Sequence, residues 1–419
     1  MTGEARQNGA DPQVMVRFEA VSIVFGPAPA TALPLMDAGR TREDIQKETG
    51  QVLGVHDCSL SVSEGEIAVL MGLSGSGKST LLRAVNGLNP VTRGEVLVRD
   101  GDPMIDVASC DPATLRRLRS DRIAMVFQQF ALLPWRTVEE NVGLGLELRG
   151  MDRDERRAIV EEKLELVGLG QWKDKYAHEL SGGMQQRVGL ARAFATDADI
   201  LLMDEPFSAL DPLIRTHLQD ELLELQRRLK KTIVFVSHDL DEALKLGSDI
   251  AIMEGGRIVQ VGRPEQIVLD PANDYVAEFV AHMNPLDVLR GASLMTPLAE
   301  LPREGDAVLL DGEGRFRVEL DGGGAPSAVS LDGRPGRLLP YTPDHGPEAW
   351  QDAALITAST EMTLRTAIEL RQASGHPVAL LEEGRLVGVC GDDEIYRGIL
   401  RQAALAPDKA KREEARDAV

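Results

Sequence analysis

A glycine-rich run, Gly72-Leu73-Ser74-Gly75-Ser76-Gly77-Lys78-Ser79-Thr80, has the residue types of a loop that binds phosphate. Its glycines allow the backbone to curl so that its N–H groups point inward, with a helix N-terminus behind them. The spacing lets the Lys78 amine reach the β- and γ-phosphates of a nucleotide, while the Ser79 hydroxyl ligates Mg²⁺. An apolar segment, IAVLM, precedes the run and an apolar helical pattern follows it. We therefore expect a complete phosphate loop.

Two adjacent carboxylates, Asp204 and Glu205, follow the apolar segment Ile200–Met203. A buried carboxylate is costly unless it meets a cation, so Mg²⁺ is the natural partner of Asp204. Glu205 can orient or deprotonate an attacking water, as phosphoryl-transfer chemistry requires. The alternative is an acidic turn after a strand, and the phosphate loop upstream makes that alternative weak. The loop and the carboxylates together predict a nucleotide-hydrolysing site.

The segments that must position these residues alternate between short apolar strands and helical patterns. Such alternation is typical of a mainly parallel α/β core. Apolar spacing of three and four between residues 138 and 179 predicts an α-helical insertion at about 130–180. Residues 27–51 predict a second, smaller helical insertion that ends at Gly50. The expected strands are 14–24, two within 52–70, 122–127, 199–203, 232–237 and 249–253.

The bulk composition limits the classes of function. The chain has 419 residues, enough for two or three domains, each with its own core. Its formal net charge of −21 argues against binding nucleic acid or anionic lipid through a basic surface. The cysteines Cys58, Cys110 and Cys390 share no short spacing, so they predict no metal site and fit a reducing compartment.

The chain shows no signal for export or for membrane insertion. Its N-terminal residues lack the apolar core of a signal peptide, and no run of about 18 apolar residues occurs. We therefore expect a cytoplasmic protein whose membrane role, if it has one, comes through a partner. Glycine and proline become dense from about Asn284, which predicts a domain boundary near 283.

A third element, Leu180-Ser181-Gly182-Gly183-Met184, precedes the carboxylates. Its serine and glycines can form the N-cap and first turn of the helix that follows. The order of loop, LSGGM element and carboxylates resembles the nucleotide-binding subunits of ATP-binding-cassette (ABC) transporters over about residues 14–282. These are P-loop ATPases that use ATP and Mg²⁺ and pair head to tail. The resemblance implies that a second copy contacts the ATP through Ser181, Gly182, Gly183 and Gln185.

The same resemblance implies roles for other residues. Gln128 stands where the family's Q-loop glutamine reaches the attacking water and Mg²⁺, whose other implied ligands are Ser79 and Asp204. His238, after the strand at 232–237, stands where the family places its switch histidine beside the γ-phosphate. Phe25 stands where an aromatic ring stacks on adenine, although an aromatic at a strand end is more often part of a core. The implied D-loop, which communicates across the dimer interface, is Ser208-Ala209-Leu210-Asp211.

Two features indicate a particular subgroup of ABC transporters. The insertion at about 27–51 and the segments MGLSGSGKSTLLRAVNGL and FQQFALLPWRTVEENV look like the ATPase subunits of importers for glycine betaine, proline betaine and choline. The sequences at 86–89 and 110–116 look most like those of the choline branch. The resemblance implies two further partners, a membrane permease and an extracytoplasmic substrate-binding protein, and a location at the cytoplasmic face of the inner membrane.

The region 284–419 resembles the cystathionine-β-synthase-type (CBS) modules that some of these subunits carry. The clearest module is 353–400, and a degenerate partner copy is expected at about 287–340. A purely structural or dimerising role and a regulatory sensor of ionic strength or an adenosine ligand both remain open. The rival class for the whole chain is a soluble ABC ATPase in DNA repair or translation. Such proteins carry long coiled coils or two fused cassettes, and this chain has a single phosphate loop.

Overall fold

The computed structural model describes residues 13–129, 131–281, 284–305, 307–342 and 355–400. The chain divides into two compact units, residues 1–263 and 264–419. This division falls before the boundary near 283 that composition suggests, and residues 282–283 lie outside the described residues. The difference arises because two helices, α11 (Pro264–Leu269) and α12 (Asp274–Val280), group with the second unit, whereas glycine and proline become dense only from about Asn284.

The first unit is built on a six-stranded sheet in the order β10-β9-β3-β8-β7-β6. All its neighbouring strands are parallel except β9 and β10, which form an antiparallel pair. Every residue of β3, β7 and β8 is buried, which explains why these strands are apolar except for Asp204 and Thr232. The strands are β3 (Ile67–Met71), β6 (Ile123–Val126), β7 (Ile200–Asp204), β8 (Thr232–Val236), β9 (Asp249–Glu254) and β10 (Arg257–Gly262).

A second, antiparallel sheet in the order β2-β1-β4-β5 shares one apolar core with the six-stranded sheet. It consists of β1 (Val14–Phe25), β2 (Val52–Ser63), β4 (Arg93–Val98) and β5 (Ile105–Asp106). The helices α3 (Lys78–Leu82), α4 (Pro112–Arg117), α9 (Pro212–Leu229) and α10 (Leu240–Leu246) connect the strands. The expected α/β core with parallel strands is confirmed.

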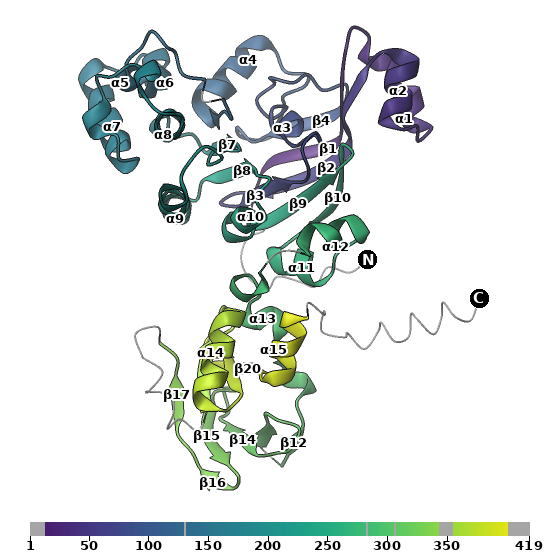
Figure 1. Cartoon of the computed structure of the whole chain (residues 1–419), viewed down its shortest axis with the longest axis vertical. Helices are drawn as coiled ribbons and strands as arrows, with labels where there is room; N and C mark the ends of the chain where they lie inside the picture. Colours follow the sequence, from purple (N-terminus) through teal and green to yellow (C-terminus); the bar gives the residue numbers. More distant parts are fainter. Residues whose placement is uncertain (1–12, 130, 282–283, 306, 343–354, 401–419) are drawn as a thin grey trace. The chain divides into compact units, whose positions relative to one another are not determined.

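Two helical insertions lie at opposite ends of this unit (Figure 1). The larger one contains α5 (Val138–Val142), α6 (Leu144–Leu148) and α7 (Arg153–Leu166), which pack near α8 (Gly182–Ala195). The smaller one contains α1 (Leu33–Asp37) and α2 (Arg42–Thr49). It has its own apolar cluster, in which Met36 and Ile45 pack with Val24 of β1 and Leu53 of β2. The cluster fixes α2 against the antiparallel sheet.

The second unit contains two five-stranded sheets. One sheet, in the order β11-β20-β19-β18-β17, carries the expected module as β18 (Leu355–Ser359), α14 (Leu364–Ser374), β19 (Val378–Glu382), β20 (Arg385–Cys390) and α15 (Asp392–Ile399). The short strands β11 (Thr296–Pro297) and β17 (Leu338–Pro340) complete its edges. A four-residue helix, α13 (Gly291–Leu294), precedes β11.

In the segment at about 287–340, where a degenerate partner copy is expected, the described residues within 303–335 form an antiparallel sheet in chain order. The strands are β12 (Arg303–Glu304), β13 (Ala307–Leu309), β14 (Phe316–Leu320), β15 (Pro326–Leu331) and β16 (Arg334–Pro335). The same segment also supplies α13 and the strands β11 and β17 of the other sheet. Apolar side chains of both sheets, among them Val318 and Leu355, share one core. In neither unit is any described helix long and apolar enough to span a bilayer.

Candidate functional site

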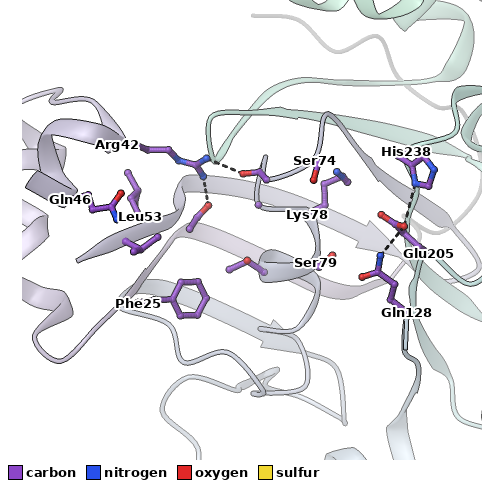
Figure 2. A pocket seen from close by; sticks show the side chains of 15 residues that line it. Phe25, Arg42, Gln46, Leu53, Ser74, Lys78, Ser79, Gln128, Glu205 and His238 are labelled. Atoms are coloured by element: carbon purple, nitrogen blue, oxygen red, sulfur yellow. Dashed lines mark hydrogen bonds and ion pairs between the residues drawn. The ribbon is translucent and has the colours of Figure 1, made fainter. Parts of the chain in front are cut away.

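A cavity of about 640 Å³ opens beside the phosphate loop (Figure 2). Segments that lie far apart in the sequence supply its lining. Of the sequence-predicted residues, the lining includes Phe25, Ser74, Gly75, Gly77, Lys78, Ser79, Thr80, Gln128, Glu205 and His238. It also includes Arg42 and Gln46 of α2 and the segment Val52–Gly54 of β2, which sequence reasoning did not single out.

The phosphate loop joins the end of β3 to the start of α3, and its shape depends on glycine. Gly72 has φ +141°, and a Cβ there would lie 2.1 Å from the Met253 carbonyl oxygen. Gly77, the N-cap of α3, has φ +103°, and its Cβ would lie 2.7 Å from the Gly54 carbonyl oxygen. Any other residue at these positions would strain the backbone and collide with a carbonyl. The loop therefore needs both glycines.

Lys78 begins α3 and is buried. Its Nζ donates to the Gly72 and Leu73 carbonyl oxygens at 2.8 and 2.9 Å. Burial lowers the pKa of this amine, while Glu205 and Asp204 favour its charged form. The amine is thus fixed inside the curl of the loop, where a phosphate would be its partner.

Asp204, at the end of β7, is fully buried and does not line the cavity directly. Its carboxylate accepts hydrogen bonds from Ser79 Oγ at 2.7 Å and from Arg83 Nε and Nη2 at 3.1 and 2.8 Å. The serine hydroxyl and the carboxylate thus form a pair of hard oxygen donors at the mouth of the phosphate loop. Mg²⁺ bound together with nucleotide phosphates needs only one or two such protein ligands, so the donor set fits this ion.

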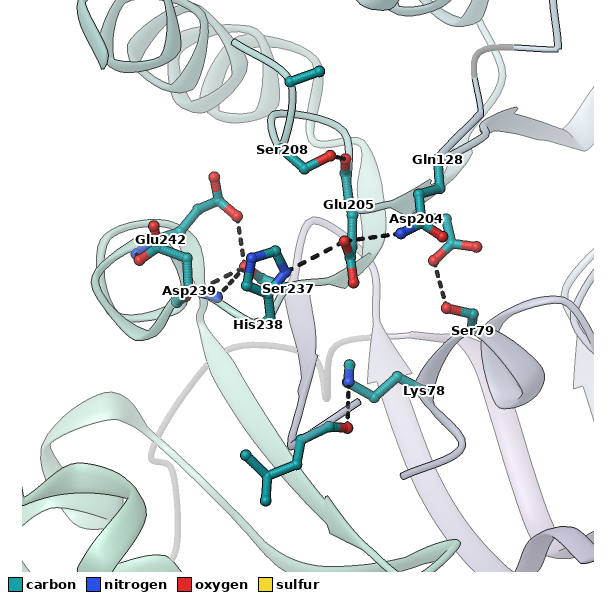
Figure 3. A network of polar contacts seen from close by, with 12 residues as sticks. Lys78, Ser79, Gln128, Asp204, Glu205, Ser208, Ser237, His238, Asp239 and Glu242 are labelled. Atoms are coloured by element: carbon teal, nitrogen blue, oxygen red, sulfur yellow. Dashed lines mark hydrogen bonds and ion pairs between the residues drawn. The ribbon is translucent and has the colours of Figure 1, made fainter. Parts of the chain in front are cut away.

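Glu205 is the centre of the polar contacts in the cavity (Figure 3). Its Oε2 accepts a hydrogen bond from Gln128 Nε2 at 3.0 Å and lies 3.3 Å from His238 Nδ1. Its φ of +47° is unusual for a residue other than glycine, and strained backbone of this kind is often found at active sites. The three residues implied for catalysis, which follow β6, β7 and β8, are therefore in contact.

A buried glutamine that sequence reasoning missed holds the backbone of Glu205. Gln186, in the first turns of α8, donates to the Glu205 carbonyl oxygen at 3.2 Å and accepts from the Ala209 N–H at 3.1 Å. Ser208 Oγ also donates to the Glu205 carbonyl oxygen, at 3.0 Å. Gln186 thereby links the helix of the LSGGM element to the D-loop and to the proposed base. Its place directly after Gln185 in the sequence was the available signal.

A second network holds the turn that carries His238 (Figure 3). Glu242 is buried and accepts hydrogen bonds from Ser237 Oγ at 2.6 Å and from Gln219 Nε2 at 3.1 Å. Burial raises the pKa of the Glu242 carboxyl, and the two hydrogen bonds oppose the shift. Ser237 Oγ in turn accepts from the Asp239 N–H at 2.9 Å, so the backbone on both sides of His238 is fixed.

The LSGGM element does not line the cavity. Ser181 is the N-cap of α8, and Ser181 and Gly182 are exposed. Gln185 Nε2 donates to the Ala177 and Leu180 carbonyl oxygens at 2.9 and 3.1 Å, so its observed contacts are within its own loop. Its expected contact with a second copy stays a prediction. In the D-loop, Asp211 caps α9 by accepting from the Ile214 N–H at 3.1 Å.

Comparison with known proteins assigns the family. The model of the ABC transporter family matches residues 55–208. The ATP-binding protein ProV of the glycine betaine/proline betaine transport system of Escherichia coli K12 is 43% identical over 394 residues, which cover 91% of this chain and 94% of ProV. The chain belongs to the ATP-binding subunits of ABC transporters.

Other ABC proteins agree with this assignment. The glycine betaine transport ATP-binding protein OpuAA of Bacillus subtilis 168 is 50% identical over 282 residues, covering 67% of this chain and 66% of OpuAA. A dimeric structure of MJ0796, a bacterial ABC transporter cassette, is 31% identical with a TM-score of 0.52, and it covers 59% of this chain and 98% of MJ0796. The ABC fold, the ATPase activity and the transport role expected from the sequence are thereby confirmed.

Proposed function

We propose that this ABC subunit hydrolyses ATP to drive import of a quaternary amine, with glycine betaine or proline betaine as the preferred substrate. The observation that carries the proposal is the extent of the match to ProV. It spans 394 residues, and it therefore continues well beyond the first unit, which ends at residue 263. ATP hydrolysis alone requires no second unit, so the shared region favours the same type of transporter.

In the proposed mechanism Glu205 prepares the attacking water. Its carboxylate lines the cavity and contacts both Gln128 and His238, so it can accept a proton from a water beside the γ-phosphate. Gln128 and His238 hold that carboxylate and the water in position. Lys78 and the N–H groups of the phosphate loop bind the β- and γ-phosphates.

Mg²⁺ is the proposed cofactor beside ATP. Ser79 and Asp204 would hold it, and Gln128, which lines the same cavity as Ser79, would be a further ligand. When bound, the ion neutralises charge on the phosphates during transfer. Ser181 and Gly182 are exposed and Gly183 is half-buried at the N-terminus of α8, where the three can bind the γ-phosphate of ATP held by a second copy.

The larger helical insertion is the proposed contact with the permease. A depression beside α5 and α7 is lined by Trp135, whose exposed fraction is 70%, and by charged side chains that include Arg136, Glu147 and Arg156. An exposed aromatic ring among charged residues is typical of a protein interface. We place the cytoplasmic loops of the permease here, and we place the subunit at the cytoplasmic face of the inner membrane, with an extracytoplasmic protein supplying the substrate.

Uptake by cells that carry the whole transporter tests the proposal. Glycine betaine uptake should be inhibited by unlabelled proline betaine more strongly than by choline, which the sequence first suggested. The matched control is Glu205→Gln, which should abolish uptake at an unchanged level of protein. Choline as the stronger competitor would overturn the substrate assignment, and uptake that persists in Glu205→Gln would overturn the energy-coupling role.

A further inference from the structure

We propose that Arg42, from the small helical insertion, is a further nucleotide-binding residue of this ABC subunit. In this proposal its guanidinium fixes the phosphate loop and places a positive charge beside the polyphosphate of the bound nucleotide. The inference rests on the ATP site and not on the transported substrate, so its test does not depend on the identity of the quaternary amine.

The contacts of Arg42 join three parts of the first unit (Figure 2). Its Nη1 donates to the Gly75 carbonyl oxygen of the phosphate loop at 3.0 Å. Its Nη2 donates to the Gly54 carbonyl oxygen of β2 at 2.5 Å. The side chain also lines the nucleotide cavity together with Gln46, one helical turn further along α2. Arg42 therefore extends from the insertion to the backbone that must wrap the phosphates.

The helix that carries Arg42 is well fixed. Thr41 caps its N-terminus by accepting from the Asp44 N–H at 3.1 Å, and Gly50 ends it with φ +71°. Ile45, three residues after Arg42, is fully buried in the cluster that joins the insertion to β1 and β2. Because the helix caps and the packing already hold α2, the guanidinium should lose little further conformational entropy when it binds a ligand in the cavity.

Among the residues that the structure describes, the charge of Arg42 has no acidic partner. No carboxylate there forms an ion pair with it, and the Gly75 and Gly54 acceptors are neutral carbonyls. Its Nε–H is buried without a hydrogen-bond partner. Partial burial lowers the pKa of the guanidinium, because its charged form is poorly solvated there. A nearby anion would relieve this cost, and the anion that enters this cavity is the nucleotide polyphosphate.

Nucleotide affinity of the full-length chain tests the proposal through two substitutions that separate charge from hydrogen bonding. Arg42→Lys keeps the charge but loses the two-pronged contact, whereas Arg42→Gln keeps a donor but loses the charge. Lys47→Ala is the matched control, because it removes one exposed positive charge from the same helix without touching the cavity. Binding of ATP, ADP and adenosine is measured by titration at low and high salt.

We expect Arg42→Gln to raise the Kd for ATP about ten-fold, the size typical of one lost charge-assisted contact. Adenosine affinity should stay unchanged, and the salt dependence of ATP binding should weaken. The Kd of Arg42→Lys for ATP should lie within about three-fold of the wild-type value, and Lys47→Ala should bind ATP with the wild-type Kd. Wild-type ATP affinity in Arg42→Gln would overturn the proposal. It would also be overturned if Arg42→Gln lost as much affinity for adenosine as for ATP, or if Arg42→Lys lost more ATP affinity than Arg42→Gln.

Discussion

Loss of Arg83 should destabilise the first unit, because it leaves a buried carboxylate without its cation. The side chain of Asp204 is 0% exposed, and Arg83 contacts it through two nitrogens. Removing one partner of a buried ion pair costs about 3–5 kcal/mol. The Arg83 side chain is 36% exposed, so water can reach the vacated space and reduce that cost. We expect Arg83→Ala to lower the free energy of unfolding by about 2 kcal/mol.

Urea unfolding followed by circular dichroism measures this loss. With a slope of roughly 3 kcal/mol per molar urea, the midpoint of the transition of the first unit should fall by about 0.7 M. The control is Arg17→Ala, which breaks an exposed pair with Glu19 and should change stability by less than about 0.5 kcal/mol. Nucleotide with Mg²⁺ should narrow the gap, because the ion brings a replacement cation to Asp204.

A double variant tests whether the uncompensated charge of Asp204 causes the stability loss in Arg83→Ala. Arg83→Ala combined with Asp204→Asn removes both charges of the pair, so it should recover part of the stability that Arg83→Ala loses. The reasoning would be refuted by a double variant that is less stable than Arg83→Ala alone. It would equally be refuted if Arg83→Ala matched the Arg17→Ala control.

Two further outcomes follow from the structure. Because burial raises the pKa of Glu242, the folded state favours the protonated carboxyl, and its contribution to stability is lost as pH rises through that raised pKa. Wild type should therefore lose stability relative to Glu242→Gln as the pH rises above the ordinary glutamate pKa of about 4.3, measured by thermal unfolding scans; an unchanged pH dependence contradicts this. A chain that ends before Asn284 should keep its ATPase activity, since every proposed catalytic residue precedes that point; loss of activity in a folded truncated chain contradicts this.

Much of the first unit could be predicted from the sequence because its strands are buried on both faces. Ile67–Met71 is apolar throughout, and Ile200–Asp204 is apolar up to its final carboxylate. Both could therefore be predicted as buried strands with the site at their ends. The phosphate loop could be predicted because Gly72 and Gly77 fill positions where a Cβ has no room. Local constraints of this kind restrict the residue types at these positions, so they can be recognised from the sequence.

The contacts of Arg42 and Arg83 could not be predicted, because they join segments that are distant in the chain. Nothing in the pattern of 27–51 distinguishes Arg42 from the other charged residues of its insertion, and the contact exists only because α2 packs on β2. The second unit was harder for a different reason. Asp311-Gly312, Asp321-Gly322 and Asp332-Gly333 mark turns of the antiparallel sheet, but an expected strand–helix repeat obscured that signal.

The central claim is that two copies of this chain share each ATP site, and complementation between two inactive variants tests it most directly. Ser181→Arg damages the surface offered to the other copy, while Lys78→Ala damages the loop that binds the copy's own ATP. A heterodimer of the two has one site damaged on both sides and one intact site. The mixture should therefore regain part of the ATPase activity that each variant lacks alone. If differently tagged subunits are shown to pair and activity still does not return, the shared site is contradicted.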